Sequence, residues 1–160
     1  MNASFDFKFG KFKIPKSLVI YSSKHFFIMF PPNPKLKNHL MIISKREVPN
    51  LSEMTNEEVF DYSLTLQFIM KKIEGFSNAH SSCVIIDEGE DIGQMIKHFH
   101  AHVIPRVKND IPNDNEIYNR MVTFDEEFVK EYSELLTNEK NKGELKLMVD
   151  QFKEYILKLN

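Results

Sequence analysis

Three histidines alternate with apolar residues in one short run of the chain: His98, His100 and His102. Neighbouring side chains of a β-strand point to opposite faces, so a strand here would place all three imidazoles on one face and the apolar residues on the other. An imidazole is polar and titrates near neutral pH, which makes three of them costly to bury on one face without partners. We therefore interpret this run as a site of chemistry rather than as a purely structural strand.

Two kinds of chemistry fit three imidazoles on one strand face. Two histidines that lie two residues apart can coordinate zinc, and a third can complete a catalytic zinc site with three imidazole ligands. Alternatively, a neutral imidazole can attack phosphorus while a neighbouring imidazole protonates the leaving oxygen. The histidines alone do not decide between a metal site and a nucleophilic site.

The strand that carries the histidines, predicted over residues 95–105, is one of five short strands that the sequence indicates. The other four are apolar runs bounded by polar or turn residues, and they cover residues 18–21, 26–30, 40–43 and 81–86. Three prolines among residues 31–34 exclude a helix between the second and third strands and favour a stiff loop. An acidic turn, residues 87–93, leads into the histidine run.

A long helix is predicted between the third and fourth strands. Thr55 and Glu58 have capping-box spacing, and apolar residues then recur at helical intervals as far as Ile73. Gly75 is predicted to end this helix. Such a stripe is typical of a helix that packs against a sheet.

Two amphipathic helices are predicted after a polar loop at residues 108–115. The first starts at Thr123, with Glu126 in capping-box spacing, and the second follows Gly143 with an apolar stripe that reaches Leu159. Apolar stripes are usually buried, so we expect this tail to pack on the sheet rather than to serve a partner.

The composition is that of a soluble globular protein. The 160 residues include 42% apolar and 28% charged residues, and the formal net charge of −2 gives no support for binding a nucleic-acid polymer. The single cysteine, Cys83, excludes an intrachain disulfide, and no stretch approaches the roughly 20 apolar residues of a membrane helix. Residues 1–17 lack the pattern of a secretory signal. We expect a cytoplasmic protein, with the nucleus as the alternative, and no membrane partner.

The residues around the histidines complete a recognisable string. Gly93 and Gln94 precede them and Pro105 and Arg106 follow, which gives G-Q-x-x-x-H-x-H-x-H-x-x-P-R. This string resembles the signature of the histidine triad (HIT) superfamily. The similarity extends over about residues 5–120, because a Phe-Gly pair at residues 9–10, an Asn-His pair at residues 38–39 and the strand series fall in matching order. Residues 113–118 resemble a stretch of the fragile histidine triad branch, which cleaves diadenosine triphosphate.

The resemblance implies an α+β fold of the HIT type, with a five-stranded antiparallel sheet, a long helix packed on it and C-terminal helices. It implies a HIT domain over residues 1–120, and we expect residues 121–160 to form a helical extension packed on the same domain. Family members usually pair as homodimers, so a homodimer is expected here.

The resemblance also implies a role for each histidine. His100 would attack the α-phosphorus and form a covalent nucleotidyl-histidine, which water then hydrolyses. His102 would contact the phosphates and assist the leaving group, and His98 would orient His100 by hydrogen bonding. His39 matches a fourth family histidine that supports the triad.

Four further residues are expected at the substrate. By resemblance, Gln94 and Gly93 line the phosphate site. Two positions depart from the family: Pro31 stands where an Asn or Asp usually contacts ribose, so that either Asn33 shifts in or ribose is held differently. Asp87 stands where the fragile histidine triad branch has a glutamine. A carboxylate repels phosphate unless it is protonated, bridged by a cation or turned away.

The expected function is that of a nucleotide hydrolase that cleaves dinucleoside polyphosphates at the α-phosphate and releases AMP. The alternatives are a nucleoside phosphoramidase of the same superfamily, a zinc hydrolase, and a catalytically weak nucleotide-binding scaffold. We expect no protein-bound metal and no tightly bound cofactor, with Mg²⁺ entering only together with the polyphosphate. Lys35, Lys37 and Lys108 lie nearby in a coarse layout and could neutralise a polyphosphate, but we interpret them as ordinary solvated lysines, because lysine is usually exposed.

Overall fold

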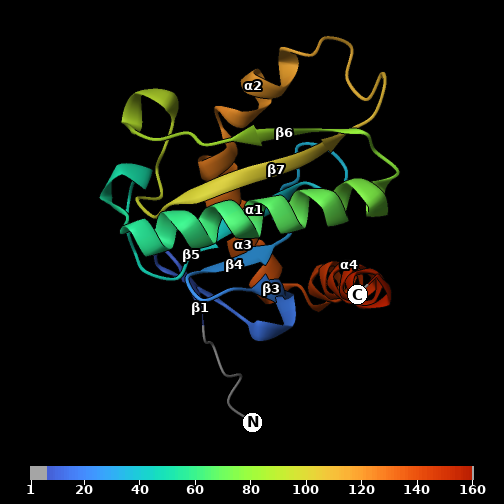
Figure 1. The fold of residues 1–160 in the computed structure, drawn as a ribbon, viewed down its shortest axis with the longest axis horizontal. Helices are drawn as coiled ribbons and strands as arrows, with labels where there is room; N and C mark the ends of the chain where they lie inside the picture. The colour runs from blue at the N-terminus through green and yellow to red at the C-terminus, as the bar shows by residue number, and fades with distance from the viewer. Residues whose placement is uncertain (1–6, 160) are drawn as a thin grey trace.

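The computed structural model describes residues 7–159 of the chain. Residues 1–6, with which the predicted HIT domain and the N-terminal segment begin, and residue 160 lie outside the described residues. Five strands form one antiparallel sheet: β3 Val19–Ser22, β4 Phe26–Met29, β5 Leu40–Ser44, β6 Ser81–Ile85 and β7 His100–Arg106. Their spatial order is β3-β4-β5-β7-β6 (Figure 1). This sheet with its helices confirms the predicted α+β fold class.

The predicted histidine strand is too long at its start. β7 begins at His100, so His98 precedes the strand. The prediction that His98 shares a strand face with His100 and His102 is therefore wrong. The backbone turns here instead, because His98 N donates to Ile96 O and Phe99 N donates to Val48 O. The other strands follow the predicted bounds to within one residue.

A hairpin, β1 Phe7–Phe9 and β2 Phe12–Ile14, precedes the sheet. It turns through Gly10, whose φ is +55°, a conformation that favours glycine. A Cβ atom at Gly10 would also lie 2.9 Å from a methyl carbon of Ile96. Glycine therefore lets the hairpin close against the loop that leads into β7.

The helix α1, Asn56–Ser77, lies across one face of the sheet (Figure 1). Its predicted capping box is confirmed, because Glu58 N donates to the Thr55 hydroxyl and Thr55 N donates to the Glu58 carboxylate. Gly75 does not end the helix, which continues to Ser77 with Asn78 in the left-handed conformation. A Cβ atom at Gly75 would lie 2.3 Å from the Tyr155 hydroxyl oxygen, so glycine serves a close helix contact there.

The tail forms three helices rather than two: α2 Glu116–Met121, α3 Phe124–Thr137 and α4 Glu139–Lys158. The predicted capping box of Thr123 and Glu126 does not form. α2 runs almost directly into α3, and the Thr123 hydroxyl donates to the Glu127 carboxylate instead. Gly143 lies inside α4, which begins with Asn138 as its cap. No helix of the described residues is long and apolar enough to cross a membrane.

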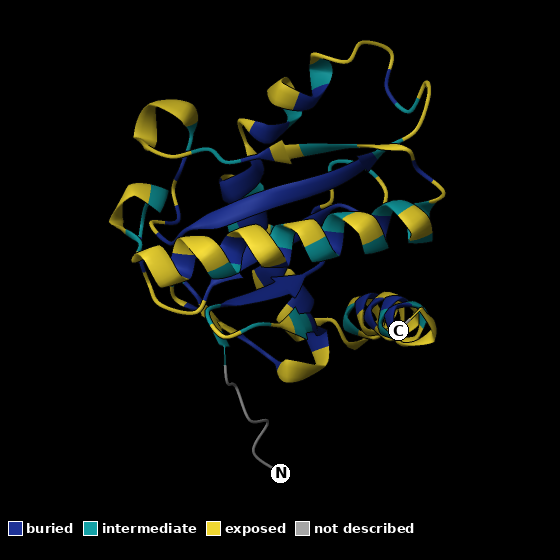
Figure 2. Ribbon diagram, in the orientation of Figure 1, coloured by how far each residue is buried: buried dark blue, intermediate teal, exposed yellow. Residues whose placement is uncertain are grey.

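The two long elements of the tail pack on different parts of the sheet. α3 crosses the face opposite α1, and α4 lies along the β3 edge (Figure 1). β7 is consequently buried along its length up to Pro105 (Figure 2). On the α1 side it presents Ala101 and Val103, with Phe99 just before it, as the alternation predicted; the histidine side is covered by α3. Three short one-turn helices lie in the connecting segments: η1 Lys16–Leu18 after the hairpin, η2 Leu51–Glu53 before α1, and η3 Glu90–Ile92 before β7.

Candidate active site

Four imidazoles meet in the interior of the protein. Contacts link His39 to His102, His102 to His100, and His100 to His98. All four side chains are buried. They come from the start of β5, the loop before β7, and β7 itself. The Phe9 ring of the hairpin packs edge-on against His100, with 4.8 Å between ring centroids. Buried ring nitrogens favour hydrogen-bond partners, and the partners that are present define which nitrogen of each ring carries the proton.

His98 is held as a neutral ring by two backbone groups. Gly10 N donates to its Nδ1 at 3.0 Å, so the ring proton lies on Nε2, which donates to Ser44 O at 2.6 Å. Burial lowers the pKa of His98, which agrees with the neutral form. The backbone carbonyl of His98 then accepts a hydrogen bond from His100 Nδ1 at 2.7 Å. His98 thus orients His100 through its carbonyl and not through its imidazole.

His39 and His102 form a second chain of fixed tautomers. Lys35 N donates to His39 Nδ1 at 3.1 Å, so His39 carries its proton on Nε2. That proton points to His102 Nδ1 at 2.9 Å, which leaves the proton of a neutral His102 on Nε2. Burial, assisted by the charge of Lys35, lowers the pKa of His39 to about 3. Burial and the neighbouring His39 lower the pKa of His102 as well, so both rings are neutral at pH 7.

The fourth ring is paired with a carboxylate that the sequence did not indicate. His100 Nε2 lies 2.9 Å from Oδ1 of Asp125, in the first turn of α3. Since the His98 carbonyl and the Asp125 carboxylate are both acceptors, His100 donates from both ring nitrogens in this arrangement. Burial raises the pKa of Asp125, but the hydrogen bonds from His100, Ile96 N and Met95 N outweigh it, so the pKa is lowered overall.

The predicted phosphate-site residues lie at the same place with differing orientations. Gln94 turns its amide to backbone groups, accepting from Gly89 N and donating to the Pro49 and Ile96 carbonyls. Gly93 has φ +90°, and a Cβ atom there would lie 2.5 Å from Val122 O. Glycine therefore allows the backbone between α2 and α3 to approach this loop closely. These two residues shape the loop rather than present polar atoms to the pocket.

Asp87 lines the small cavity beside His100, and Asn33 binds the backbone of α3 at Phe124. Asp87 is half-buried, and burial raises its pKa, with His100 opposing the shift and Asp125 adding to it. Asn33 is 8% exposed; its Nδ2 donates to Phe124 O at 3.1 Å, and its Oδ1 is buried without a hydrogen-bond partner. An orphaned buried acceptor is rare and marks a position where a donor from a ligand would be favourable.

The interpretation of Lys35 as a solvated lysine is wrong. Its side chain is only 10% exposed, and its ammonium group is paired with the Glu127 carboxylate of α3. The charge lies close enough to lower the pKa of both His39 and His102. The sequence offers no local signal of this pairing, because the two residues are 92 positions apart.

Little space remains beside His100. The cavity measures about 10 Å³, roughly room for one water molecule, and its wall consists of Asp87, Ile92, Gly93, Gln94, His100, His102, Met121, Phe124 and Asp125. A larger hollow of about 800 Å³ lies by β6 and α2, but none of these four imidazoles lines it. The chemistry-bearing residues therefore meet in a site that α3 closes.

The geometry gives no support to a zinc site made from the three histidines. Both ring nitrogens of His98 are engaged by backbone groups. Within residues 7–159, no three His, Cys, Asp or Glu side chains come together as a metal ion would require. Instead, the His98 carbonyl orients the His100 imidazole, and the His102 imidazole carries its N–H on Nε2.

Comparison with known proteins shows the family of the chain. Residues 12–109 match the family model described as "HIT domain". The chain is 30% identical over 151 residues to the Arabidopsis thaliana "Bifunctional bis(5'-adenosyl)-triphosphatase/adenylylsulfatase FHIT", covering 93% of this chain and 82% of that protein. It is 34% identical over 132 residues to the Dictyostelium discoideum "Bis(5'-adenosyl)-triphosphatase", covering 79% and 89%.

A third relative is a longer protein. The Caenorhabditis elegans "Nitrilase and fragile histidine triad fusion protein NitFhit" is 32% identical over 120 residues, which cover 75% of this chain. The chain spans about a quarter of that protein's length, 27%. The crystal structure of the nematode protein superposes with a TM-score of 0.65 at 27% identity, covering 80% of this chain and 31% of that one.

Proposed function

The chain belongs to the HIT domain family, and on that premise we propose that it is a nucleotide hydrolase that cleaves dinucleoside polyphosphates at the α-phosphate. Two relatives that align over most of their length are named as bis(5'-adenosyl)-triphosphatases, which supports a diadenosine triphosphate type of substrate. The observation that carries the proposal is the hydrogen bond from His100 Nδ1 to the His98 carbonyl. It leaves Nε2 as the nitrogen that can bear a nucleophilic lone pair.

The first step is attack of neutral His100 on the α-phosphorus. The bond from Nε2 to phosphorus forms, the bond to the leaving polyphosphate oxygen breaks, and positive charge develops on the ring. The His98 carbonyl stabilises that charge through Nδ1–H. His102 offers its Nε2–H to the phosphate or leaving oxygen, and His39 keeps that tautomer in place. A polyphosphate leaves readily as an anion, so a hydrogen bond suffices.

The second step is hydrolysis of the nucleotidyl-histidine. Water attacks phosphorus, the P–N bond breaks, and the nucleoside monophosphate leaves while the proton of the water passes to solvent. One difficult displacement is thereby divided into two easier ones. The proposal includes no tightly bound cofactor; Mg²⁺ carried by the polyphosphate would offset the charge of Asp87 near the site.

Substitution of the proposed nucleophile tests the function. His100→Asn replaces the imidazole by a smaller polar amide and removes the attacking nitrogen, so AMP release from diadenosine triphosphate should fall at least about 10⁴-fold. His80→Asn is the matched control, because His80 is exposed on a turn away from the site. Retained turnover in His100→Asn would contradict the proposal that His100 is the nucleophile.

The leaving group is resolved by a comparison of substrates. Diadenosine triphosphate, diadenosine tetraphosphate and an adenosine phosphoramidate should be offered side by side, and we expect the triphosphate to be hydrolysed with the highest kcat/KM. A preference for the phosphoramidate would favour the phosphoramidase alternative. Nucleotide binding without turnover of any of them would favour the scaffold alternative, and chelator-sensitive activity with stoichiometric zinc would favour the zinc hydrolase.

The proposal extends to a homodimer. Among the described residues, β6 pairs only with β7, so its outer edge is open to another strand. Val84 on β6 and Phe60 and Leu64 on α1 are large apolar residues that are 38%, 67% and 49% exposed. Light scattering should give the mass of two chains, and Val84→Lys should shift it toward one. Leu157→Lys on α4 is the control, and a monomeric wild type would contradict the pairing.

A further inference from the structure

We propose that residues 116–127, here called the plug segment, form a built-in inhibitor of this site, with the Asp125 carboxylate occupying the position that the reacting phosphate needs. The inference rests on the proposed function, because it takes His100 as the nucleophile. The plug segment comprises α2 and the first turn of α3. It holds the site closed until a polyphosphate nucleotide or a release of α3 displaces it.

The carboxylate of Asp125 is bound as an anionic ligand would be. Oδ1 accepts from His100 Nε2 at 2.9 Å, and Oδ2 accepts from Met95 N at 2.8 Å and Ile96 N at 3.0 Å. The side chain is 5% exposed, so three donors converge on one buried negative group. Phosphate oxygens accept the same kinds of hydrogen bond. The donor set therefore fits a phosphoryl group as well as the carboxylate that now fills it.

Occupancy by Asp125 and reaction at His100 exclude each other. With the carboxylate in place, Nε2 carries a proton and has no lone pair to attack phosphorus. The remaining cavity of about 10 Å³ is also too small for a phosphoryl group with its nucleoside. The closed arrangement is accordingly an inactive one.

The residue before Asp125 covers the second catalytic imidazole. The Phe124 ring lies edge-on to His102, with 4.4 Å between ring centroids, and also contacts His39 at 5.4 Å. Consecutive residues of α3 thus cover the nucleophile and the group that would face the leaving oxygen. Removal of one helix turn would uncover both.

Polar contacts outside the pocket fasten the plug segment to the proline-rich loop. Asn33 Nδ2 donates to Phe124 O, the Lys35 ammonium pairs with Glu127, and an Arg120 guanidinium nitrogen donates to Lys35 O. Release would expose the Asn33 amide and the Lys35 ammonium beside the imidazoles. Asn33 already has an orphaned acceptor there, Oδ1, which a hydroxyl of the substrate could satisfy. A polyphosphate nucleotide can therefore bind the Asn33 and Lys35 groups that the plug segment releases.

The expected consequence is a reduced apparent reactivity of the wild-type protein. When only a fraction of molecules has the plug segment displaced, the apparent affinity and kcat/KM fall by that fraction. A variant that weakens the plug segment should raise kcat/KM, whereas loss of a catalytic group should lower it. The direction of change separates the two roles.

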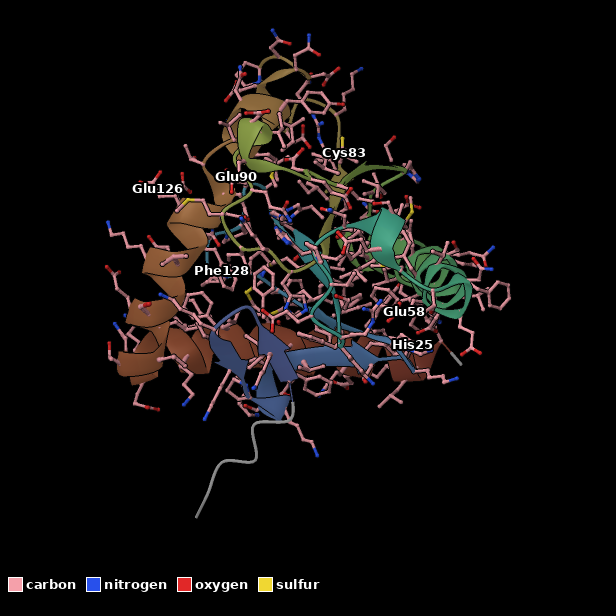
Figure 3. The ribbon with its side chains drawn as sticks, turned by 90° about the vertical axis from the view of Figure 1, so that its left-hand side faces the viewer. His25, Glu58, Cys83, Glu90, Glu126 and Phe128 are labelled. Carbon is pink, nitrogen blue, oxygen red and sulfur yellow. The ribbon has the colours of Figure 1, made fainter. Side chains whose placement is uncertain are left out.

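Chemical labelling of His100 tests the plug segment without any substrate. Diethyl pyrocarbonate acylates unprotonated, accessible imidazole nitrogens, and peptide mass spectrometry reports the rate at each histidine. Asp125→Ala should raise the acylation rate of His100 at least about tenfold over wild type. Glu126→Ala is the matched control, because Glu126 lies on the outer side of α3 while Phe128 faces inward (Figure 3). The exposed His80 should label equally in all variants.

A milder variant guards against an unfolded one. Glu127→Gln removes only the partly exposed partner of Lys35 and should give a smaller rise in His100 labelling, with an unchanged circular dichroism spectrum. Equal labelling of His100 in wild type, Asp125→Ala and Glu127→Gln would overturn the inference. So would a lower kcat/KM for diadenosine triphosphate in Asp125→Ala, since a plug cannot assist catalysis. Raised labelling with no hydrolysis by any variant would support the plug segment and contradict the proposed function.

Discussion

The two faces of β7 are both buried, yet they are covered in different ways. Toward α1, Ala101 and Val103 meet an apolar layer, and Phe99 packs edge-on against Tyr62 of α1. Toward α3, His100 and His102 meet Asp125 and Phe124. Exposing the apolar side chains to water would cost free energy that no new contact recovers. A hydrogen-bonded anion, in contrast, can be exchanged for another anion. One cover is a permanent core, and the other is replaceable by a phosphate.

The largest effect is expected on the α1 face. Phe99→Ala removes a ring that is 1% exposed, and its cavity should cost about 3–5 kcal/mol of unfolding free energy. Urea unfolding followed by circular dichroism measures this. The specific activity of the molecules that remain folded should stay close to wild type. A loss below about 1 kcal/mol would mean that this face is not the rigid one.

A substitution on the histidine face should lower the activity more than the stability, the reverse of Phe99→Ala. His102→Asn keeps a polar side chain but removes the imidazole Nε2–H that, in the proposed mechanism, faces the leaving group, so hydrolysis should fall about 10²–10⁴-fold. The free energy of unfolding should change less than in Phe99→Ala. Steady-state kinetics and urea unfolding of the same preparation provide both numbers. Equal losses of stability for the two variants would erase the difference between the faces.

Acid should loosen the histidine face first. The folded-state pKa of His39 is about 3, below the value of 6.5 expected in the unfolded chain, so the unfolded state binds more protons between these values. Stability from His39 is therefore fully present above pH 6.5 and is lost as the pH falls toward 3. Between pH 6.5 and pH 5 the loss should be about 2 kcal/mol.

Urea unfolding at a series of pH values checks the acid prediction, with His39→Gln as the variant that should flatten the profile. His98 and His102 also have lowered pKa values and should add to the slope in the same direction. A stability that stays constant from pH 7 to pH 5 would contradict neutral, buried imidazoles on this face.

The smallest effect is expected at the cap of α1. Thr55→Ala removes the hydroxyl that accepts from Glu58 N and should cost about 1 kcal/mol of stability. Thermal unfolding measures the cost, and turnover per folded molecule should not change. A changed kcat would indicate that α1, and not only α3, communicates with the imidazoles.

Local pattern was sufficient for most of the sheet and for α1. Apolar runs between turn residues place the strands to within one residue, apart from the start of β7, and the Thr55–Glu58 box places the start of α1. The alternation of His98 with the other two misled, because Gly10 N and Ser44 O hold that ring off the strand. A tertiary contact from 88 residues away overrode a local periodicity.

The closing of the site could not be predicted from the sequence. Asp125 reads as an ordinary acidic residue in the first turn of a helix, where such residues are common. Its role depends on α3 crossing the sheet, which brings it to His100 and to the amides of Met95 and Ile96. Lys35 was misread for the same reason, since Glu127 reaches it from the same helix turn.

The central claim, that His100 is the nucleophile, is tested most directly by trapping its covalent intermediate. Enzyme in excess over diadenosine triphosphate should be quenched rapidly with alkali, digested and analysed by peptide mass spectrometry. We predict an adenylyl group on the peptide that contains His100, absent in His100→Asn and retained in His80→Asn. Hydrolysis that proceeds with no adduct, or with an adduct on another residue, would contradict the account.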